Sequence, residues 1–196
     1  MQNHTQLPTG LSFSYETERL ILRLPSTDYL REIHDFLYRN RSCFEKYEPT
    51  APENYYTLDF QQMLARCELK LALKLSSVRF YVFLKEDPST IIGTVCLHNI
   101  IKMPYFTSEV GYKFDASYQH HGYAREALSM ALSVGFYGLG LHKIFARCMP
   151  ENTPSRNLLH ATGFFEEGME RDSILIQGKW ENHIRYAILN PDEIHS

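Results

Sequence analysis

The stretch Gln119-His120-His121-Gly122-Tyr123-Ala124-Arg125-Glu126-Ala127 lies between a predicted strand that ends near Phe114 and a strongly amphipathic segment. That segment predicts a helix, because small and apolar residues recur at i, i+3, i+4, i+7, i+8 and i+11: Ala124, Ala127, Leu128, Ala131, Leu132 and Gly135. A loop that leads into a helix leaves backbone N–H groups without partners, and these groups attract an anion. Gly122 and Ala124 are small enough to let a ligand approach the main chain. The stretch therefore predicts a pyrophosphate site that needs neither a lysine nor a metal.

Two common nucleotide-binding patterns are missing from the sequence. It contains no GxxxxGK[ST] motif and no GxGxxG motif after a first strand. A single glycine ahead of a helix also has an ordinary explanation, since many such glycines only form a tight turn. The surrounding sequence therefore has to decide whether this loop binds a ligand.

Working outward from the loop, the residue patterns predict one α/β layered domain. Apolar runs bounded by turn residues predict seven strands, at about 19–24, 78–85, 91–101, 108–114, 143–149, 164–176 and 179–189. The three strands between 78 and 114 are joined by short connections, which favours an antiparallel meander.

Helical spacing predicts four helices, at about 30–38, 57–75, 124–138 and 153–163. The second should carry its apolar residues on one side: Phe60, Met63, Leu64, Cys67 and Leu71. The fourth should begin with Thr153 as cap and Pro154 at the first helical position, and should stop at Gly163. The segment 40–56 is interpreted as an irregular loop or a short helix.

Composition narrows the class of protein. The 196 residues are 44% hydrophobic and 22% charged, which is typical of a soluble globular domain. A net charge of −3 argues against a nucleic acid as the main ligand. The start, Met1 to Pro8, lacks the pattern of a signal peptide, and no apolar run is long enough to span a bilayer, so we expect a cytoplasmic protein without a membrane partner.

The cysteines and histidines indicate no metal. Four cysteines, at 43, 67, 96 and 148, lack the spacing of a zinc site or a disulfide framework, and we expect them to be reduced and packed. Nine histidines likewise show no ligand spacing.

Several motifs together resemble the GNAT acetyltransferase superfamily. Gln119-x-x-Gly122-x-Ala124 is similar to the Q/R-x-x-G-x-G/A coenzyme A motif of that family, on the expected strand, loop and helix. Asn152 to Phe164 resembles its second signature. Three further segments resemble its opening and central strands: 17–23, 92–93 and 111–112. The resemblance implies a GNAT domain over residues 16–190, with an N-terminal extension at 1–15 and a tail at 191–196.

The segment Asn40 to Pro49 is similar to the corresponding stretch of ribosomal-protein alanine N-acetyltransferases, with Tyr47 in place of the usual tryptophan. The resemblance implies a central mixed, mostly antiparallel sheet of about seven strands flanked by about four helices. It further implies acetyl-CoA as co-substrate and a protein N-terminus, such as that of a ribosomal protein, as acceptor. Dimers are common in the family, and a homodimer stays open.

The resemblance also implies cofactor-binding residues. Main-chain groups of Tyr112, Lys113 and Phe114 would pair with the pantetheine arm and the acetyl oxygen, and Asn152 would hold the arm from its other side. The pyrophosphate would lie on the loop and the helix start: Gln119, His120, His121, Gly122, Tyr123, Ala124 and Arg125.

The sequence offers more than one candidate for the catalytic residues. The tyrosine often found seven residues after the family's asparagine is Leu159 here, which cannot donate a proton. Ser155 lies where this branch carries a serine thought to act on the thiolate, although a serine in a first helical turn can also simply assist a cap. Glu109 or Glu48 could take the amine proton, with His98 as a lesser candidate. Glu48 and His98 are also candidates for acceptor binding.

Two other functions stay open. A small amine, such as a polyamine or an aminoglycoside, could replace the protein N-terminus, although acidic and basic residues are balanced between Arg39 and Glu53. The chain could also be a non-catalytic acyl-CoA-binding regulatory module. Leu159 permits that interpretation, whereas the presence of both Asn152 and Ser155 argues against it.

Overall fold

The computed structural model describes residues 10–193. Residues 1–9 and 194–196 lie outside the described part, and with them most of the predicted extension at 1–15 and half of the predicted tail at 191–196. The described residues form one sheet in the order β1-β2-β3-β4-β5-β6-β8-β7. Its strands are β1 (Ser14–Glu16), β2 (Leu20–Arg23), β3 (Val78–Leu84), β4 (Ile91–Ile101), β5 (Thr107–Phe114), β6 (Lys143–Cys148), β7 (Phe165–Ile176) and β8 (Lys179–Leu189).

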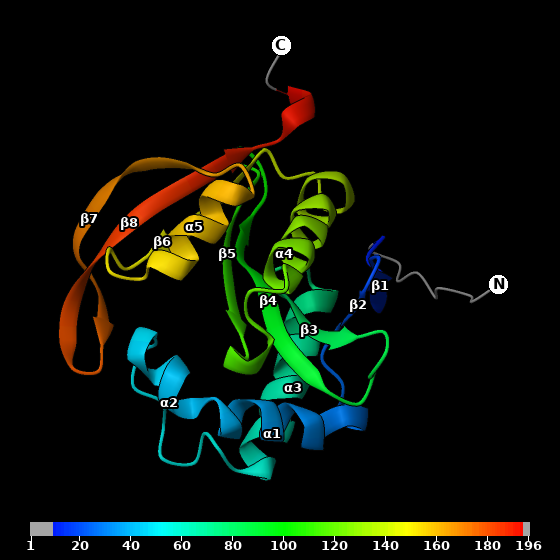
Figure 1. Cartoon of the computed structure of the whole chain (residues 1–196). Helices are drawn as coiled ribbons and strands as arrows, with labels where there is room; N and C mark the ends of the chain where they lie inside the picture. The colour runs from blue at the N-terminus through cyan, green and yellow to red at the C-terminus, as the bar shows by residue number, and fades with distance from the viewer. Residues whose placement is uncertain (1–9, 194–196) are drawn as a thin grey trace.

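Helices cover both faces of this sheet (Figure 1). In the described chain they are α1 (Leu30–Arg39), α2 (Arg41–Phe44), α3 (Leu58–Leu73), α4 (Tyr123–Ser133) and α5 (Thr153–Ala161), with a π-helical turn after α4 at Val134–Gly138. Helices α4 and α5 lie on one face, and α1 to α3 on the other. Short 3-10 turns complete the chain: η1 (Thr27–Tyr29), η2 (Glu45–Tyr47), η3 (Ala116–Tyr118) and η5 (Pro191–Glu193).

The topology confirms the predicted mixed, mostly antiparallel sheet. Every neighbouring pair is antiparallel except β5 and β6, which are parallel. The predicted meander is present as β3-β4-β5. The described residues hold eight strands rather than seven and five α-helices rather than four. The additions are β1, whose three residues are too few to show a periodic pattern, and the four-residue α2. The latter lies in the segment 40–56, where a short helix was one of the two expectations.

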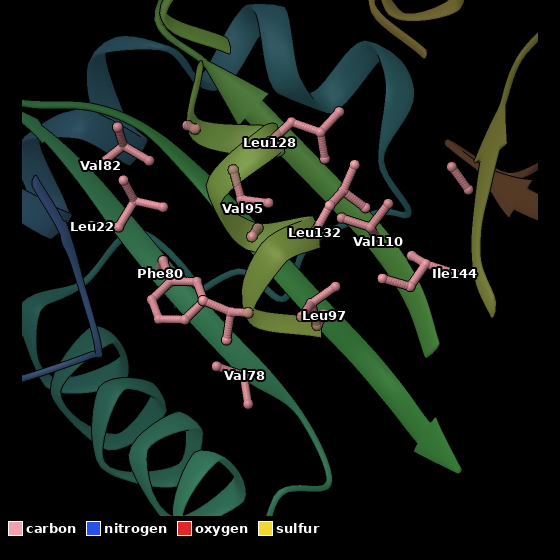
Figure 2. Close-up of a cluster of buried hydrophobic side chains, with 14 of the residues drawn as sticks. Leu22, Val78, Phe80, Val82, Val95, Leu97, Val110, Leu128, Leu132 and Ile144 are labelled. Carbon is pink, nitrogen blue, oxygen red and sulfur yellow. The ribbon is translucent and has the colours of Figure 1, made fainter. Parts of the chain in front are cut away.

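The main core lies between the sheet and α4 (Figure 2). Branched and aromatic side chains from β2, β3, β4, β5 and β6 meet Leu128 and Leu132 of the helix, and all of them are at most 6% exposed. Leu11 is also buried in this cluster, and β1 begins ahead of residue 16. The predicted domain boundary at residue 16 stays a prediction.

The predicted apolar side of α3 is wrong. Met63 and Leu71 are 51% and 43% exposed, whereas Gln61, Ala65 and Ala72 are buried. Two alanines on the inner side let the helix lie close to the sheet. On the same side Glu68 reaches Arg79 of β3 at 2.5 Å. Periodicity alone favours the bulkier stripe, whose members are here exposed or only half-buried.

Two smaller expectations also need correction. The cap of α5 is Asn152 rather than Thr153, because Asn152 Oδ1 accepts the N–H of Ser155 at 3.2 Å. All four cysteines are free, but only Cys96 and Cys148 are buried, and Cys43 and Cys67 are exposed. Within residues 10–193, no helix combines the length and the apolar character needed to cross a membrane.

Candidate functional site

The site begins where β5 and β6 part. Their parallel pairing covers only Thr107↔Lys143, Ser108↔Ile144 and Glu109↔Phe145, although both strands continue beyond it. From Val110 onward β5 therefore pairs with β4 alone. The sheet opens at this point between two strands that run in the same direction, with α4 following one of them and α5 the other (Figure 1).

The register decides which main-chain groups face this gap. Asp115 N donates to Ile92 O at 2.9 Å, so odd-numbered residues of β5 pair with β4. Tyr112 and Phe114 consequently turn their N–H and C=O groups toward the gap. The expectation for Lys113 needs correction, because its main chain faces β4 and only its side chain reaches the neighbourhood of the site.

The loop after β5 leads into α4 through a glycine in the left-handed region. Gly122, at φ +81°, is the residue before the first turn, and no side chain caps that turn. The ladder of α4 starts with Glu126 N donating to Gly122 O at 3.1 Å. The N–H groups of Tyr123, Ala124 and Arg125 are thus left for a ligand, and the helix dipole adds positive potential there.

Arg19 of the β1–β2 connection holds this loop from outside. Its guanidinium donates to Glu126 Oε2 (Nε, 2.8 Å) and to His121 O (Nη1, 2.9 Å), and it lies 4.7 Å from the centre of the Tyr123 ring. Thr17 Oγ1 and the N–H of Arg19 also donate to Glu126. Burial acts to raise the pKa of Glu126, but these hydrogen bonds hold the pKa below its ordinary value.

A buried carboxylate anchors the start of the same loop. Asp115, 3% exposed, accepts from Arg39 Nε at 2.6 Å, from Asn40 Nδ2 at 3.0 Å and from Ser117 N at 2.9 Å. Burial opposes its ionisation, but these contacts keep its pKa below the ordinary value. Neither Asp115 nor the Arg19–Glu126 pair was predicted as part of the site. The only sequence signal was that Arg19 stands in the opening-strand motif.

The other predicted loop residues lie along the surface between η3 and α4. Gln119, His120, His121 and Arg125 are exposed, whereas Tyr123 and Ala124 are half-buried. His120 has a φ of +64°, and His121 stacks on Tyr123 and contacts Gln119 O through Nδ1 at 2.7 Å. Both histidines therefore shape the loop.

On the α5 side of the gap, two hydroxyl groups meet. Tyr112 Oη lies 2.9 Å from Ser155 Oγ and donates to Ser155 O at 3.2 Å. Burial raises the pKa of the Tyr112 hydroxyl well above its ordinary value, so it stays protonated. Leu159 is fully buried in the core. The structure thus brings Tyr112, Ser155 and Asn152 together beside the gap.

Glu48, Glu109 and His98 lie on the opposite face of the sheet. Glu48 accepts from Lys113 Nζ at 2.8 and 3.1 Å, and Glu109 is paired with Arg147, which also donates to Glu170 at 2.6 Å. Burial lowers the pKa of Lys113, although Glu48 opposes this shift. Both carboxylates are therefore already engaged by cations.

The tip of the β7–β8 hairpin closes one side of this face. Gln177 Nε2 donates to Glu45 O and Glu48 O, both at 3.1 Å, so the hairpin reaches the segment that follows α2 (Figure 1). A cavity of about 420 Å³ lies farther along the same face, and Glu109, Phe145, Arg147 and Arg185 contribute to its walls. Among residues 10–193, no group of three or more His, Cys, Asp or Glu side chains could hold a metal.

Comparisons with known proteins agree with this geometry. A family model described as "Acetyltransferase (GNAT) domain" matches residues 19–165. "Probable N-acetyltransferase YjcK" of Bacillus subtilis is 34% identical over 79% of this chain and 84% of its own length. "[Ribosomal protein uS5]-alanine N-acetyltransferase" of Escherichia coli is 29% identical over 90% of each chain. The crystal structure of ribosomal-protein-S5-alanine acetyltransferase from Vibrio fischeri superposes with a TM-score of 0.86 at 31% identity, covering 91% of this chain and 97% of that one.

Proposed function

The chain belongs to the GNAT acetyltransferases, and we propose that acetyl-CoA is its donor and the N-terminal amine of a protein its acceptor. The observation that carries the proposal is the combination of a gap between two parallel strands with an uncapped helix start beside it. The gap between the strands can hold the pantetheine arm, and the free N–H groups at the helix start can hold the pyrophosphate. No other described helix of eight or more residues begins with a left-handed glycine.

The residues present fit this donor. The main-chain N–H groups from His120 to Arg125 would hold the pyrophosphate, because Gly122 keeps a side chain out of the cradle and Arg19 adds a positive charge next to it. A Cβ on Gly122 would stand 3.4 Å from Arg19 Nη2. Main-chain groups of Tyr112 and Phe114 would hold the arm that carries the acetyl thioester, with α5 on its other side. Bound acetyl-CoA supplies an activated acetyl group.

Ser155 and Tyr112 would serve the sulfur end of the reaction. A departing thiolate needs hydrogen-bond donors and then a proton. The two hydroxyls at 2.9 Å form a pair in which Tyr112 can donate to Ser155 while Ser155 donates onward. This pair would replace the tyrosine that other family members carry at the position of Leu159.

The charges on the acceptor face favour a peptide over a polyamine. A polycation needs several unpaired carboxylates, but Glu48 and Glu109 already have Lys113 and Arg147 as partners. A peptide N-terminus brings one amine followed by uncharged amide groups. The similarity to a uS5-alanine acetyltransferase supports the same choice. Such an acceptor would be met in the cytoplasm, which is also the compartment that we expect for this chain.

The test is acetyl transfer to a matched acceptor panel. Purified protein and acetyl-CoA would be offered a peptide with a free N-terminal alanine and an internal lysine, the same peptide with a blocked N-terminus, and spermidine. We expect thiol release, and a mass gain at the α-amine, with the first peptide only. Transfer to spermidine alone would establish the small-amine alternative. Binding of acetyl-CoA without turnover on any acceptor would favour the regulatory module.

A further inference from the structure

We infer that His98, and not Glu109, accepts the proton that the acceptor amine loses during acetyl transfer. The inference rests on the proposed function and assigns the proton acceptor for the same site. It depends on where the ring of His98 lies, on what already binds the competing carboxylates, and on the charges around the ring.

His98 lies where the gap begins. It is the partner of Glu109 across the β4–β5 ladder, at the last residue of β5 that pairs with β6. Its ring does not stand straight across from Glu109 but leans along β5. Nε2 is 3.7 Å from the point where a Cβ on Gly111 would stand. Because Gly111 has no side chain, the ring nitrogen faces the strand beside Tyr112, whose main chain borders the gap.

Glu109 is not free to act as a base. Its carboxylate is bound to the guanidinium of Arg147, and only 15% of its side chain is exposed. Arg147 is fixed in turn by Glu170 at 2.6 Å. Taking up a proton on Glu109 would break its half-buried ion pair with Arg147, so this carboxylate is already committed to a partner. Glu48 is bound by Lys113 in the same way.

His98 has no such engagement. Its main-chain oxygen accepts from Ser108 Oγ at 2.7 Å, but within residues 10–193 neither ring nitrogen makes a hydrogen bond. The charged groups that face the ring are Glu109 from β5, Arg79 from β3 and Arg147 from β6, and Glu68 of α3 pairs with Arg79 behind them. Burial first, and then the two arginines, lower the pKa of His98, while Glu109 opposes them. The imidazole is therefore neutral at pH 7 and able to take a proton.

The neutral amine nitrogen forms a bond to the acetyl carbon, the carbon–sulfur bond breaks, and the sulfur keeps the electron pair. His98 Nε2 takes the proton from the nitrogen and later returns it to solvent. The sulfur, held by hydrogen bonds from the Ser155–Tyr112 pair, gains one proton from solvent.

The test compares His98→Gln with Glu109→Gln in the full chain, using acetyl-CoA and the peptide acetylated in the panel above. In the wild type we expect kcat to fall in acid, with an apparent pKa below the usual value of about 6.5 for histidine. His98→Gln should lower kcat by about 100-fold or more and remove that acid limb. Its Kd for acetyl-CoA should stay within about twofold, since it touches no proposed cofactor contact. Glu109→Gln should still show the fall of kcat in acid.

A second variant protects the test against misfolding. Gly111→Ala places a methyl group at ordinary contact distance from Nε2, so it should fold with the ring in place. It should lower kcat by about tenfold or more, because the methyl group occupies the space beside Nε2 that the acceptor amine would enter. The inference is overturned if His98→Gln keeps kcat within about threefold or keeps the acid limb, or if Glu109→Gln removes that limb. Failure of the wild type to acetylate any amine would instead overturn the proposed function, and the inference with it.

Discussion

The two helices beside the gap begin in opposite ways. Helix α4 starts from a left-handed glycine with no side-chain cap, whereas α5 starts from Asn152, whose side chain satisfies the N–H of Ser155. Both follow one of the two parallel strands. This contrast supports our proposal that the uncapped start of α4 binds a ligand, since a side chain satisfies the corresponding N–H group at the start of the neighbouring helix.

Different contacts stabilise the two helix starts. Around α4, groups distant in sequence hold the loop: Arg19 and Thr17 bind Glu126, and Arg39 and Asn40 bind Asp115. Around α5, the cap is local, and the helix offers a side chain, Ser155, to the gap. We therefore expect α4 to bind the donor through its main chain and α5 to act through a hydroxyl.

Variants of the hydroxyl pair on the α5 side should give the greatest loss of activity. Ser155→Ala should lower kcat by about 100-fold, with Tyr112→Phe nearly as damaging, because the two act as one unit. The double variant should be little worse than Ser155→Ala, which is a non-additive cycle. The Kd of acetyl-CoA should change by less than about threefold, since the pyrophosphate contacts lie on α4. Ser129→Ala, on the exposed side of α4, is the matched control. Additive losses would show that the hydroxyls act separately.

The next effect concerns the anchor of the α4 loop. Asp115→Asn should lower the free energy of unfolding at pH 7 by about 2 kcal/mol, because it breaks a buried charge-assisted network. The folded pKa of Asp115 lies below its unfolded value, so this stabilisation is present above about pH 4 and is lost as the pH falls through the folded pKa. Urea unfolding at neutral and acid pH should show the difference between wild type and variant shrinking in acid. Asp59→Asn, at an exposed carboxylate, should show neither effect.

A smaller effect tests the ordinary cap of α5. Asn152→Ala should cost about 1 kcal/mol, or a Tm lower by about 2–4 °C for a domain of this size, because one N–H at the helix start loses its partner. Asn152→Asp should restore most of the stability, since a carboxylate accepts the same hydrogen bond. If the alanine variant has the same Tm as the wild type, the side-chain cap of α5 does not contribute to stability.

The smallest effect concerns Arg19. Arg19→Gln should weaken acetyl-CoA binding by a few-fold, since the loop keeps its main-chain donors but loses an external brace and a nearby positive charge. The loss should diminish at high salt, because the residue is exposed and its field is screened. Arg66→Gln, at an exposed position of α3, is the control and should bind acetyl-CoA like the wild type.

Much of the fold could be predicted from local sequence. The remaining parts could not be predicted, and each has a physical reason. The β3-β4-β5 meander and the β7–β8 hairpin were predicted within about one residue of their observed bounds, because turn residues bound each run. The inner face of α3 was not, because small alanines and a glutamine form its buried side, and periodicity favours the bulkier apolar stripe. For the site, a glycine ahead of an amphipathic helix was a local signal. The Arg19–Glu126 brace and the Tyr112–Ser155 contact join residues 107 and 43 positions apart, and no local pattern marks them.

We propose that the uncapped start of α4 binds the pyrophosphate of acetyl-CoA. Calorimetric titration of acetyl-CoA into the wild type, Gly122→Glu and Gly140→Glu would test this assignment. Gly140 is also left-handed, at φ +65°, but nothing lies within 4 Å of a Cβ there, so its variant carries similar backbone strain without touching the cradle. We predict that Gly122→Glu weakens binding by at least about 100-fold, or roughly 2.7 kcal/mol, while Gly140→Glu stays within about twofold of the wild type. Equal binding by the two variants would contradict the account.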